Sequence, residues 1–413
     1  LILARLDVPG SIYESLKTLQ ERDISYAEMS HSYNVLPSVG KYLEIQRFEF
    51  DRRGHEEIAE AGPVKIPGWI KASVLGAMKH LYPDFDLKEF EPSLRLLWLN
   101  HDAYLRISPP ERVARVLWLY QQGIRHDGLF FDVEKKEDES GREESRILFS
   151  VGNPSQKGFL TQVSEIFQRL DIGVRRSYCL IISTGIHPYF LGNFYVLTRD
   201  GKLLEKGSEL FKTLQNELYN TQILSNTSVF YSDFVSRRVL TGEEASLTNA
   251  FCAFCHTFLA HQDPDRFDVN MVTDAFHSNP DITLRLIRLF KTRFDPDLQG
   301  REALYEQALK ETGEIVENYH TGQRYLDEVR RTIFRLCLFF IKRTLKTNFF
   351  VPEKHALAFR LDPGILTDLG PEFTSDLPPE KPFRITFFFS RHAEGYHIGF
   401  SDIARGGWRT ILC

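Results

Sequence analysis

The sequence predicts an α+β protein in which groups of strands and groups of helices follow one another along the chain. Two segments, residues 1–53 and 146–222, each show the pattern strand, helix, strand, strand. Residues 243–346 keep the spacing of apolar side chains that is typical of helices, and from Phe349 the period changes to two. These three observations predict two small mixed modules, a helical region and a second group of strands.

The first module begins with an apolar run at residues 1–7, which predicts a short strand. Asp7-Val8-Pro9-Gly10 then predicts a turn, because proline fixes φ and glycine accepts a positive φ. Helical spacing follows over residues 12–19. Residues 25–35 and 41–50 are rich in aromatic and β-branched side chains, so they are predicted to be the remaining two strands.

Residues 63–132 are predicted to be mainly helical, and one helix start is clearly marked. Ser108-Pro109-Pro110-Glu111 has the form of a capping box with proline at the first helical position. Four apolar side chains then fall on one face of the expected helix, at Val113, Val116, Leu117 and Tyr120. We expect this face to pack in the core rather than to bind a ligand.

The charged segment 133–145 predicts a solvated hairpin or linker, and it is the predicted domain boundary. Residues 146–222 then repeat the first layout and add a helix. Five residues recur 145 positions later: Ile2, Leu3, Pro9, Ser32 and Tyr33 return as Ile147, Leu148, Pro154, Ser177 and Tyr178. Because the helix between them does not keep this register, the repeat only suggests that the two modules share a fold.

The composition is that of an ordinary globular chain. Of the 413 residues 42% are hydrophobic and 26% are charged, and the net charge is −5. This charge does not favour binding to nucleic acid or to an anionic membrane. We find no signal peptide in residues 1–10 and no apolar run close to the ~20 residues of a membrane span. Five cysteines do not suggest a disulfide framework, so a cytoplasmic location is expected.

Cys252-Ala253-Phe254-Cys255-His256 matches the attachment motif of c-type haem. The surrounding residues predict an apolar helical stripe, so these cysteines are interpreted as small core residues. With His261 the motif also offers a zinc set, but its ligands would spread around one helix. We therefore expect neither metal nor haem.

A group of basic residues near the end of the helical region is expected to oppose a helix dipole rather than to bind nucleic acid: Arg330, Arg331, Arg335, Lys342, Arg343 and Lys346.

The C-terminal stretch 395–409 carries the most specific motif. Alternating residues predict a half-buried strand that leads into Gly406-Gly407, and Arg405 and Arg409 flank this pair. Adjacent glycines let a ligand approach the main chain, and the planar guanidinium groups suit carboxylates. The residues alone leave two alternatives open, an anion site and a plain turn.

This stretch, GYHIGFSDIARGGWRTI, resembles the start of the substrate domain of large NAD-dependent glutamate dehydrogenases. Segments at 96–122, 347–350 and 355–366 are also similar to parts of that family. Gly399 stands where the family usually has arginine. The resemblance implies that Arg405 takes the place of a lysine that meets a substrate carboxylate, that Gly406 and Gly407 line the substrate, and that Arg409 braces the turn.

The resemblance also implies L-glutamate or 2-oxoglutarate as the ligand of the parent enzyme and NAD as its cofactor. The catalytic lysine and the proton-shuttling aspartate of the family would lie beyond these residues, so no catalytic residue is expected in this chain. None of the 26 glycines is followed by another two positions later, so a dinucleotide fingerprint is absent. The chain, from Leu1 to Cys413, is therefore expected to be a piece of a longer enzyme and inactive alone.

The two mixed modules resemble ACT domains, with the βαββ order of that fold. By this resemblance Asp7, Pro9 and Gly10 would bind an amino-acid effector at a helix N-terminus, or the modules would only pack subunits of a homo-oligomer together.

The predicted division has five parts: an ACT-like module at 1–62, a helical connector at 63–132, a linker and ACT-like module at 133–235, a helical region at 236–346 and the first strands of an incomplete substrate-domain sheet at 347–413. The alternative function is a stand-alone ACT-type regulatory or amino-acid-binding protein.

Overall fold

The computed structural model describes residues 1–32, 34–50, 54–137, 141–155, 157–260, 263–365, 384–399 and 408–412. The chain divides into two compact units, Leu1–Thr221 and Gln222–Cys413, and each is considered by itself. Both units combine helices with an antiparallel sheet, so the predicted α+β class is confirmed.

Two segments with the same connectivity build the seven-stranded sheet of the first unit. The first contains β1 (Ile2–Leu6), α1 (Ser11–Thr18), β2 (Tyr26–His31) and β3 (Leu43–Glu49), and the second contains β5 (Glu143–Gly152), α6 (Phe159–Arg169), β6 (Ile172–Ser183) and β7 (Pro188–Thr198). In each segment the last strand lies between the other two. Because β2 pairs with β6, one sheet results, with the order β1-β3-β2-β6-β7-β5-β4. The repeat suggested by the sequence is present in this connectivity, whereas the likeness to ACT domains stays a prediction.

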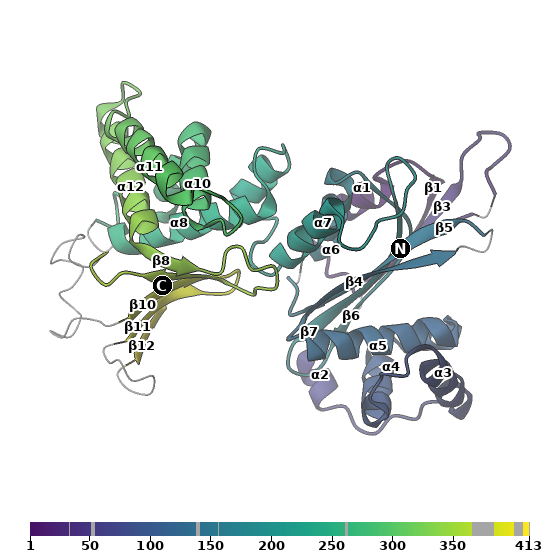
Figure 1. The fold of residues 1–413 in the computed structure, drawn as a ribbon. Helices are drawn as coiled ribbons and strands as arrows, with labels where there is room; N and C mark the ends of the chain where they lie inside the picture. Colours follow the sequence, from purple (N-terminus) through teal and green to yellow (C-terminus); the bar gives the residue numbers. More distant parts are fainter. Residues whose placement is uncertain are drawn as a thin grey trace. The chain divides into compact units, whose positions relative to one another are not determined.

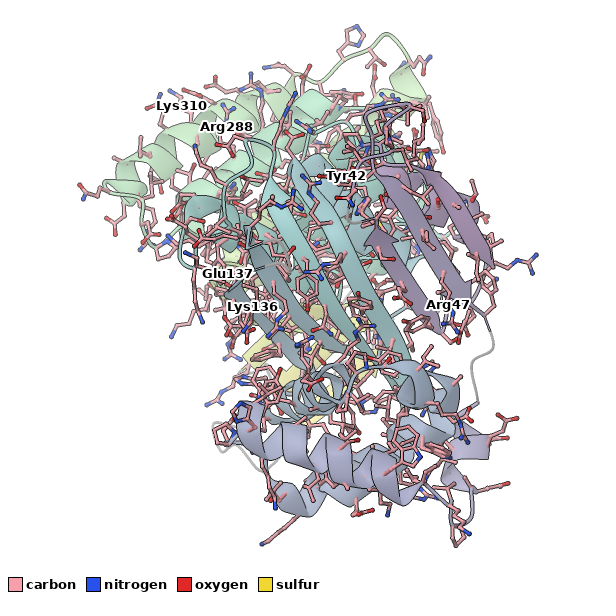
Figure 2. The ribbon with its side chains drawn as sticks, turned by 90° about the vertical axis from the view of Figure 1, so that its right-hand side faces the viewer. Tyr42, Arg47, Lys136, Glu137, Arg288 and Lys310 are labelled. Carbon is pink, nitrogen blue, oxygen red and sulfur yellow. The ribbon has the colours of Figure 1, made fainter. Side chains whose placement is uncertain are left out.

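In its described residues, 133–137 and 141–145, the charged segment 133–145 forms two paired strands, as expected for a hairpin. β4 (Leu129–Glu137) pairs with β5 in unbroken register from Leu129 opposite Val151 to Glu137 opposite Glu143. Figure 2 shows Lys136 and Glu137 on this side of the sheet and Arg47 on β3 toward its other edge. These strands belong to the first unit, and the boundary between the two compact units falls between residues 221 and 222. The finer division into five parts stays a prediction.

The inner strands of this sheet are buried on both faces. Along β5, Ile147, Phe149 and Val151 pack in one apolar cluster and Leu148 packs in another. The first cluster includes α1, α6 and α7 (Glu209–Asn220), and the second includes α3 (Gly68–Leu81), α4 (Phe90–Ile107) and α5 (Pro110–Arg125). The unit therefore has three layers, with helices on either side of the sheet (Figure 1). Two short elements, α2 (His55–Ala59) and η1 (Leu87–Glu89), complete the connections.

The helix predicted after Ser108 forms, but its capping box is wrong. The first helical position is a proline, as predicted, but it is Pro110 instead of Pro109. Pro109 is the N-cap of α5 and makes no side-chain hydrogen bond. Ser108 therefore lies one position too early to cap the helix, and Glu111 falls at the second helical position instead of the third. Ser108 instead ends α4, where its amide donates to the Tyr104 carbonyl.

The second unit packs helices on a five-stranded sheet of order β12-β11-β10-β9-β8. Its helical elements are η2 (Phe230–Val235), α8 (Gly242–Ala260), α9 (Val269–His277), α10 (Pro280–Phe294), α11 (Arg301–Glu317) and α12 (Arg324–Arg343). Its strands are β8 (Thr344–Thr347), β9 (Leu357–Leu361), β10 (Arg384–Phe389), β11 (Glu394–Gly399) and β12 (Trp408–Leu412). Buried phenylalanines fill the space between the layers, and Phe254 and Phe340 lie with their ring centroids 4.3 Å apart. Among the described residues, no helix is both long enough and apolar enough to cross a membrane.

The basic residues of α12 are held by acidic partners within the second unit. Arg330 pairs with Asp274, Arg335 with Glu317, and Arg343 with Asp362. These pairs give three of the six basic residues named from the sequence a structural role within the second unit.

Helices α1 and α6 pack against each other and begin in the same way. Each follows a glycine in the left-handed region, Gly10 with φ of 79° and Gly158 with φ of 71°. The Thr161 hydroxyl donates to the Leu16 carbonyl at the end of α1, over 3.1 Å. At the other end of the pair, a Cβ added to Gly10 would lie 3.0 Å from Nε2 of Gln168. The start of each helix therefore meets the end of the other.

This packing predicts that Gly10→Ala destabilises the first unit more than Gly40→Ala does. Both glycines have a positive φ, which costs an alanine about 1 kcal/mol, but only Gly10 has a neighbour within 4 Å of the added methyl group. We expect Gly10→Ala to lower the free energy of unfolding by about 2 kcal/mol and Gly40→Ala by about 1 kcal/mol. Urea unfolding followed by tryptophan fluorescence measures this, because Trp69, Trp98 and Trp118 all lie in this unit. Equal losses in the two variants would contradict the packing of α1 on α6.

Candidate functional site

The turn between β1 and α1 brings together polar residues from three strands. The Ser11 amide donates to the Val8 carbonyl over 3.1 Å, which closes the predicted turn. Asp7 follows β1 directly, and Gly10 precedes α1. The predicted effector residues Asp7, Pro9 and Gly10 therefore share one turn at the N-terminus of a helix, where backbone amides favour anions.

A histidine and a glutamate from the neighbouring strands complete this group. His31 at the end of β2 lies directly opposite Glu44 of β3. Nε2 of His31 is 3.4 Å from Oδ1 of Asp7 and 3.2 Å from Oε2 of Glu44. The side chain of Glu44 is only 1% exposed, that of His31 is 10% exposed, and that of Asp7 is 29% exposed. The group therefore runs from the protein interior to the surface through Asp7.

Hydrogen bonds hold the buried carboxylate of Glu44 on both oxygens. Ser11 donates its hydroxyl to Oε2 over 2.5 Å, and Gln46 donates Nε2 to Oε1 over 2.5 Å. Burial by itself would raise the pKa of Glu44, but the hydrogen bonds from His31, Ser11 and Gln46 outweigh it and lower the pKa. Burial likewise opposes a charge on His31, whereas the bonds to Glu44 and to the Arg175 carbonyl raise the pKa of His31. Geometry and charge thus favour a cation between the two carboxylates.

Asp7, His31 and Glu44 form the one group in the described part of the chain whose donor atoms are close enough for a metal ion, all lying within 4.8 Å of one another. The sequence did not predict this group. Its members are separated by 24 and 13 positions along the chain, and no ligand motif has that spacing. Only the pairing of three strands brings them together.

The predicted glutamate-binding residues lie mostly outside the described part of the chain. Arg405, Gly406 and Gly407 are not among the described residues, and for Arg409 only the backbone is described. Arg409 lies in β12 opposite Ile398 of β11, and Gly399 is paired with Trp408. Both ends of the segment that carries Arg405 are therefore fixed by strand pairing at one end of the second sheet.

The cysteines of the haem-like motif lie in the core, as interpreted from the sequence. Cys252 and Cys255 are buried in α8 within the apolar cluster of the second unit. Burial raises the pKa of the Cys252 thiol well above its usual value, which makes it a poor nucleophile and a poor metal ligand. Cys337 of α12 is buried in the same cluster. His261, the fourth residue of the zinc set, lies outside the described residues.

A cavity of about 470 Å³ lies among the helices of the first unit and was also not predicted. Its walls include apolar side chains such as Ile66, Leu96 and Tyr120, and charged ones such as Lys71 and Glu91. Lys71 and Glu91 form an ion pair of 2.7 Å. This pairing neutralises two of the charged side chains in the walls, and we assign the cavity no function.

Comparisons with known proteins relate the chain to one group of enzymes. The family described as bacterial NAD-glutamate dehydrogenase, catalytic domain, matches residues 321–411. NAD-specific glutamate dehydrogenase of Neurospora crassa is 25% identical over 321 residues, which are 68% of this chain and 28% of that protein. The protein of the same name from Pseudomonas aeruginosa is 32% identical over 155 residues, 35% of this chain and 8% of that protein. That from Saccharomyces cerevisiae is 44% identical over 72 residues, 17% of this chain and 6% of that protein.

The chain thus spans less than a third of the length of these relatives. The matched family covers α12 and the second sheet up to Ile411, which includes the stretch that carried the resemblance in the sequence. The alignment with the Neurospora crassa protein extends over two thirds of the chain, so the relationship is not confined to that stretch. The resemblance found in the sequence is confirmed: this chain is similar to part of the large NAD-specific glutamate dehydrogenases.

Proposed function

We propose that the chain is part of an enzyme that converts L-glutamate, water and NAD to 2-oxoglutarate, ammonia and NADH. The observation that supports this most directly is the match of residues 321–411 to a catalytic-domain family, because it includes Arg405 and Arg409. In this proposal the second unit supplies one corner of the substrate site. The first unit serves assembly and regulation in a cytoplasmic homo-oligomer.

In the proposed site, Arg405 donates to a carboxylate of the substrate, Gly406 and Gly407 let the substrate approach the main chain, and Arg409 braces the segment. Pairing of Gly399 with Trp408 supports this role, because it ties both flanks of the segment to a sheet with a buried apolar face. A guanidinium group binds a carboxylate through two parallel hydrogen bonds, which orients as well as attracts it. The carboxylate of glutamate would thereby be fixed relative to the reacting carbon.

NAD binding and catalysis are assigned to other parts of the parent enzyme. No glycine here is followed by another two positions later, as a dinucleotide-binding turn requires, and the catalytic lysine of the family has no counterpart here. We therefore propose that the 413 residues alone do not transfer a hydride. The bound NAD would accept the hydride, and the protein would hold it against the substrate.

The substrate-site proposal predicts that Arg405→Ala, in the full-length enzyme that contains this chain, raises the KM for glutamate about 10-fold or more. A hydrogen bond between charged groups contributes about 1.5–3 kcal/mol, which corresponds to that factor. NADH formation followed at 340 nm measures it. The matched control is Arg288→Ala, because Arg288 is an exposed arginine of α10 in the same unit (Figure 2).

An unchanged KM in Arg405→Ala would remove Arg405 from the substrate site. Equal effects of the two arginine variants would point to a general loss of charge or stability. Glutamate-dependent NADH formation by the 413-residue chain alone would contradict the assignment of catalysis to other parts.

Regulation is the second part of the proposal, with an amino-acid effector at the turn of Asp7, Pro9 and Gly10. The support is the shared connectivity of the two βαββ segments and the left-handed Gly10 before α1. We expect calorimetric titration of the chain with the common amino acids to find at least one that binds, and Pro9→Ala to weaken it by loosening the turn. Absence of binding by every amino acid would leave the first unit with assembly alone.

A further inference from the structure

The group formed by Asp7, His31 and Glu44 has the features of a built cation site, and this inference does not rest on the proposed function. Each residue is fixed by an element of the sheet: Asp7 by the end of β1, His31 by the end of β2, and Glu44 by an interior position of β3. His31 and Glu44 are directly opposite each other across paired strands. Their side chains therefore meet without any contribution from a long loop.

The orientation of the imidazole is set from outside the group. Nδ1 of His31 lies 2.5 Å from the carbonyl oxygen of Arg175. A carbonyl can only accept, so Nδ1 carries a hydrogen and Nε2 is the atom that faces the two carboxylates. Histidines that bind metals commonly donate their second ring nitrogen to a backbone carbonyl or a carboxylate in this way.

The Arg175 carbonyl is available because strand β6 is irregular at this point. The pairing of β6 with β7 shifts register between Val174 and Arg176. β2 pairs with β6 from Tyr26 to Met29, and His31 lies beyond the last of these pairs. A bulge re-aims groups that would otherwise serve the ladder, and here it directs a backbone carbonyl to the imidazole.

The spacing of the donor atoms fits a small divalent ion. Zn²⁺ lies about 2.0–2.2 Å from nitrogen and oxygen ligands, so two tetrahedral ligands are about 3.3–3.6 Å apart. Nε2 of His31 lies 3.4 Å from the Asp7 oxygen and 3.2 Å from the Glu44 oxygen. Both distances are close to this range, and Asp7 is exposed enough to admit an ion from solvent.

A buried acceptor beside the group lacks a partner. Gln46 is fully buried and directs its amide at Glu44, but its Oε1 has no hydrogen-bond partner among the described residues. A buried polar atom of this kind is normally satisfied, often by an ordered water. A water bound to an ion in the group would be one such partner for Oε1.

We propose that Asp7, His31 and Glu44 bind one divalent transition-metal ion, with Zn²⁺ the best fit. The imidazole nitrogen favours Zn²⁺ over Mg²⁺ and Ca²⁺, which prefer all-oxygen sites. The ion ties the ends of β1, β2 and β3 together at the edge of the bulge in β6. The arrangement that competes with it is a protonated His31 between the two carboxylates, with no ion bound.

Metal titration of the chelator-treated full chain separates the two arrangements. We expect one equivalent of Zn²⁺ to bind, measured by calorimetry and by elemental analysis after gel filtration, and Mg²⁺ at about 1 mM not to compete. His31→Ala and Asp7→Asn should each weaken binding at least ~10-fold. Asp7→Asn keeps the shape of a partly exposed side chain, so it tests the site even if changes at the buried Glu44 prevent folding.

The matched control is His277→Ala. His277 also lies beside an acidic residue, with Nε2 2.9 Å from Asp233, but no third ligand is near enough to complete a set in the described structure. This variant should bind Zn²⁺ as the parent chain does. Co²⁺ adds a spectroscopic check, because a four-coordinate site gives strong visible absorption that His31→Ala should abolish.

Three results would overturn the proposal. They are the absence of stoichiometric Zn²⁺ binding, binding that survives both His31→Ala and Asp7→Asn, and binding that is lost in His277→Ala. The first result would establish the protonated His31 as the occupant of the space between the carboxylates. The other two would place the ion elsewhere on the chain.

Discussion

The first unit depends on the antiparallel pairing of β2 with β6, because this pairing makes one sheet of two βαββ segments. Tyr26 to Met29 pair with Leu180 to Ser177, and the Ile181 amide extends the contact to the Ser25 carbonyl. A three-stranded sheet with one helix buries little apolar surface on its own. Joined through β2 and β6, the segments share one apolar cluster on each face, and α1 packs on α6. Arg112 of α5 contacts both of these strands. Its guanidinium lies 3.8 Å from the ring of Tyr178 in β6 and within 4.0 Å of the carboxylate of Glu28 in β2.

The joining of the segments also completes the polar group of Asp7, His31 and Glu44, because the second segment supplies the Arg175 carbonyl that holds His31. Glu44 is buried because β3 is an interior strand whose inward face meets α1, and a buried carboxylate requires hydrogen bonds and a nearby positive charge. Ser11 and Gln46 provide the hydrogen bonds, and His31 is held in place by a carbonyl of β6. Residues from both segments therefore contribute to one site. The same turn carries Asp7 and Gly10, so any ligand that binds there would act on the contact between the two segments.

Much of the fold could be predicted from the sequence, since it depends on local patterns. Apolar runs and segments rich in aromatic and β-branched residues predicted the strands of the βαββ segments, and helical spacing predicted the region from 243 to 346. The capping box at Ser108 was wrong because two consecutive prolines allow the helix to begin one residue later than the motif suggests. The site could not be predicted, because Asp7, His31 and Glu44 are brought together by strand pairing and a bulge rather than by spacing. The family was recognised from 395–409, a stretch whose order of residues is specific in itself.

Hydrogen exchange of the backbone amides that pair β2 with β6 tests most directly whether the two βαββ segments form one sheet. If the two segments form one cooperative sheet, the paired backbone amides of β2 and β6 should exchange as slowly as those between β6 and β7, and urea should release both sets together. Mass spectrometry of peptides from residues 25–31 and 176–196 resolves the two sets. Fast exchange of the β2 amides, with β6 and β7 still protected, would show that the first segment opens independently and would contradict the account.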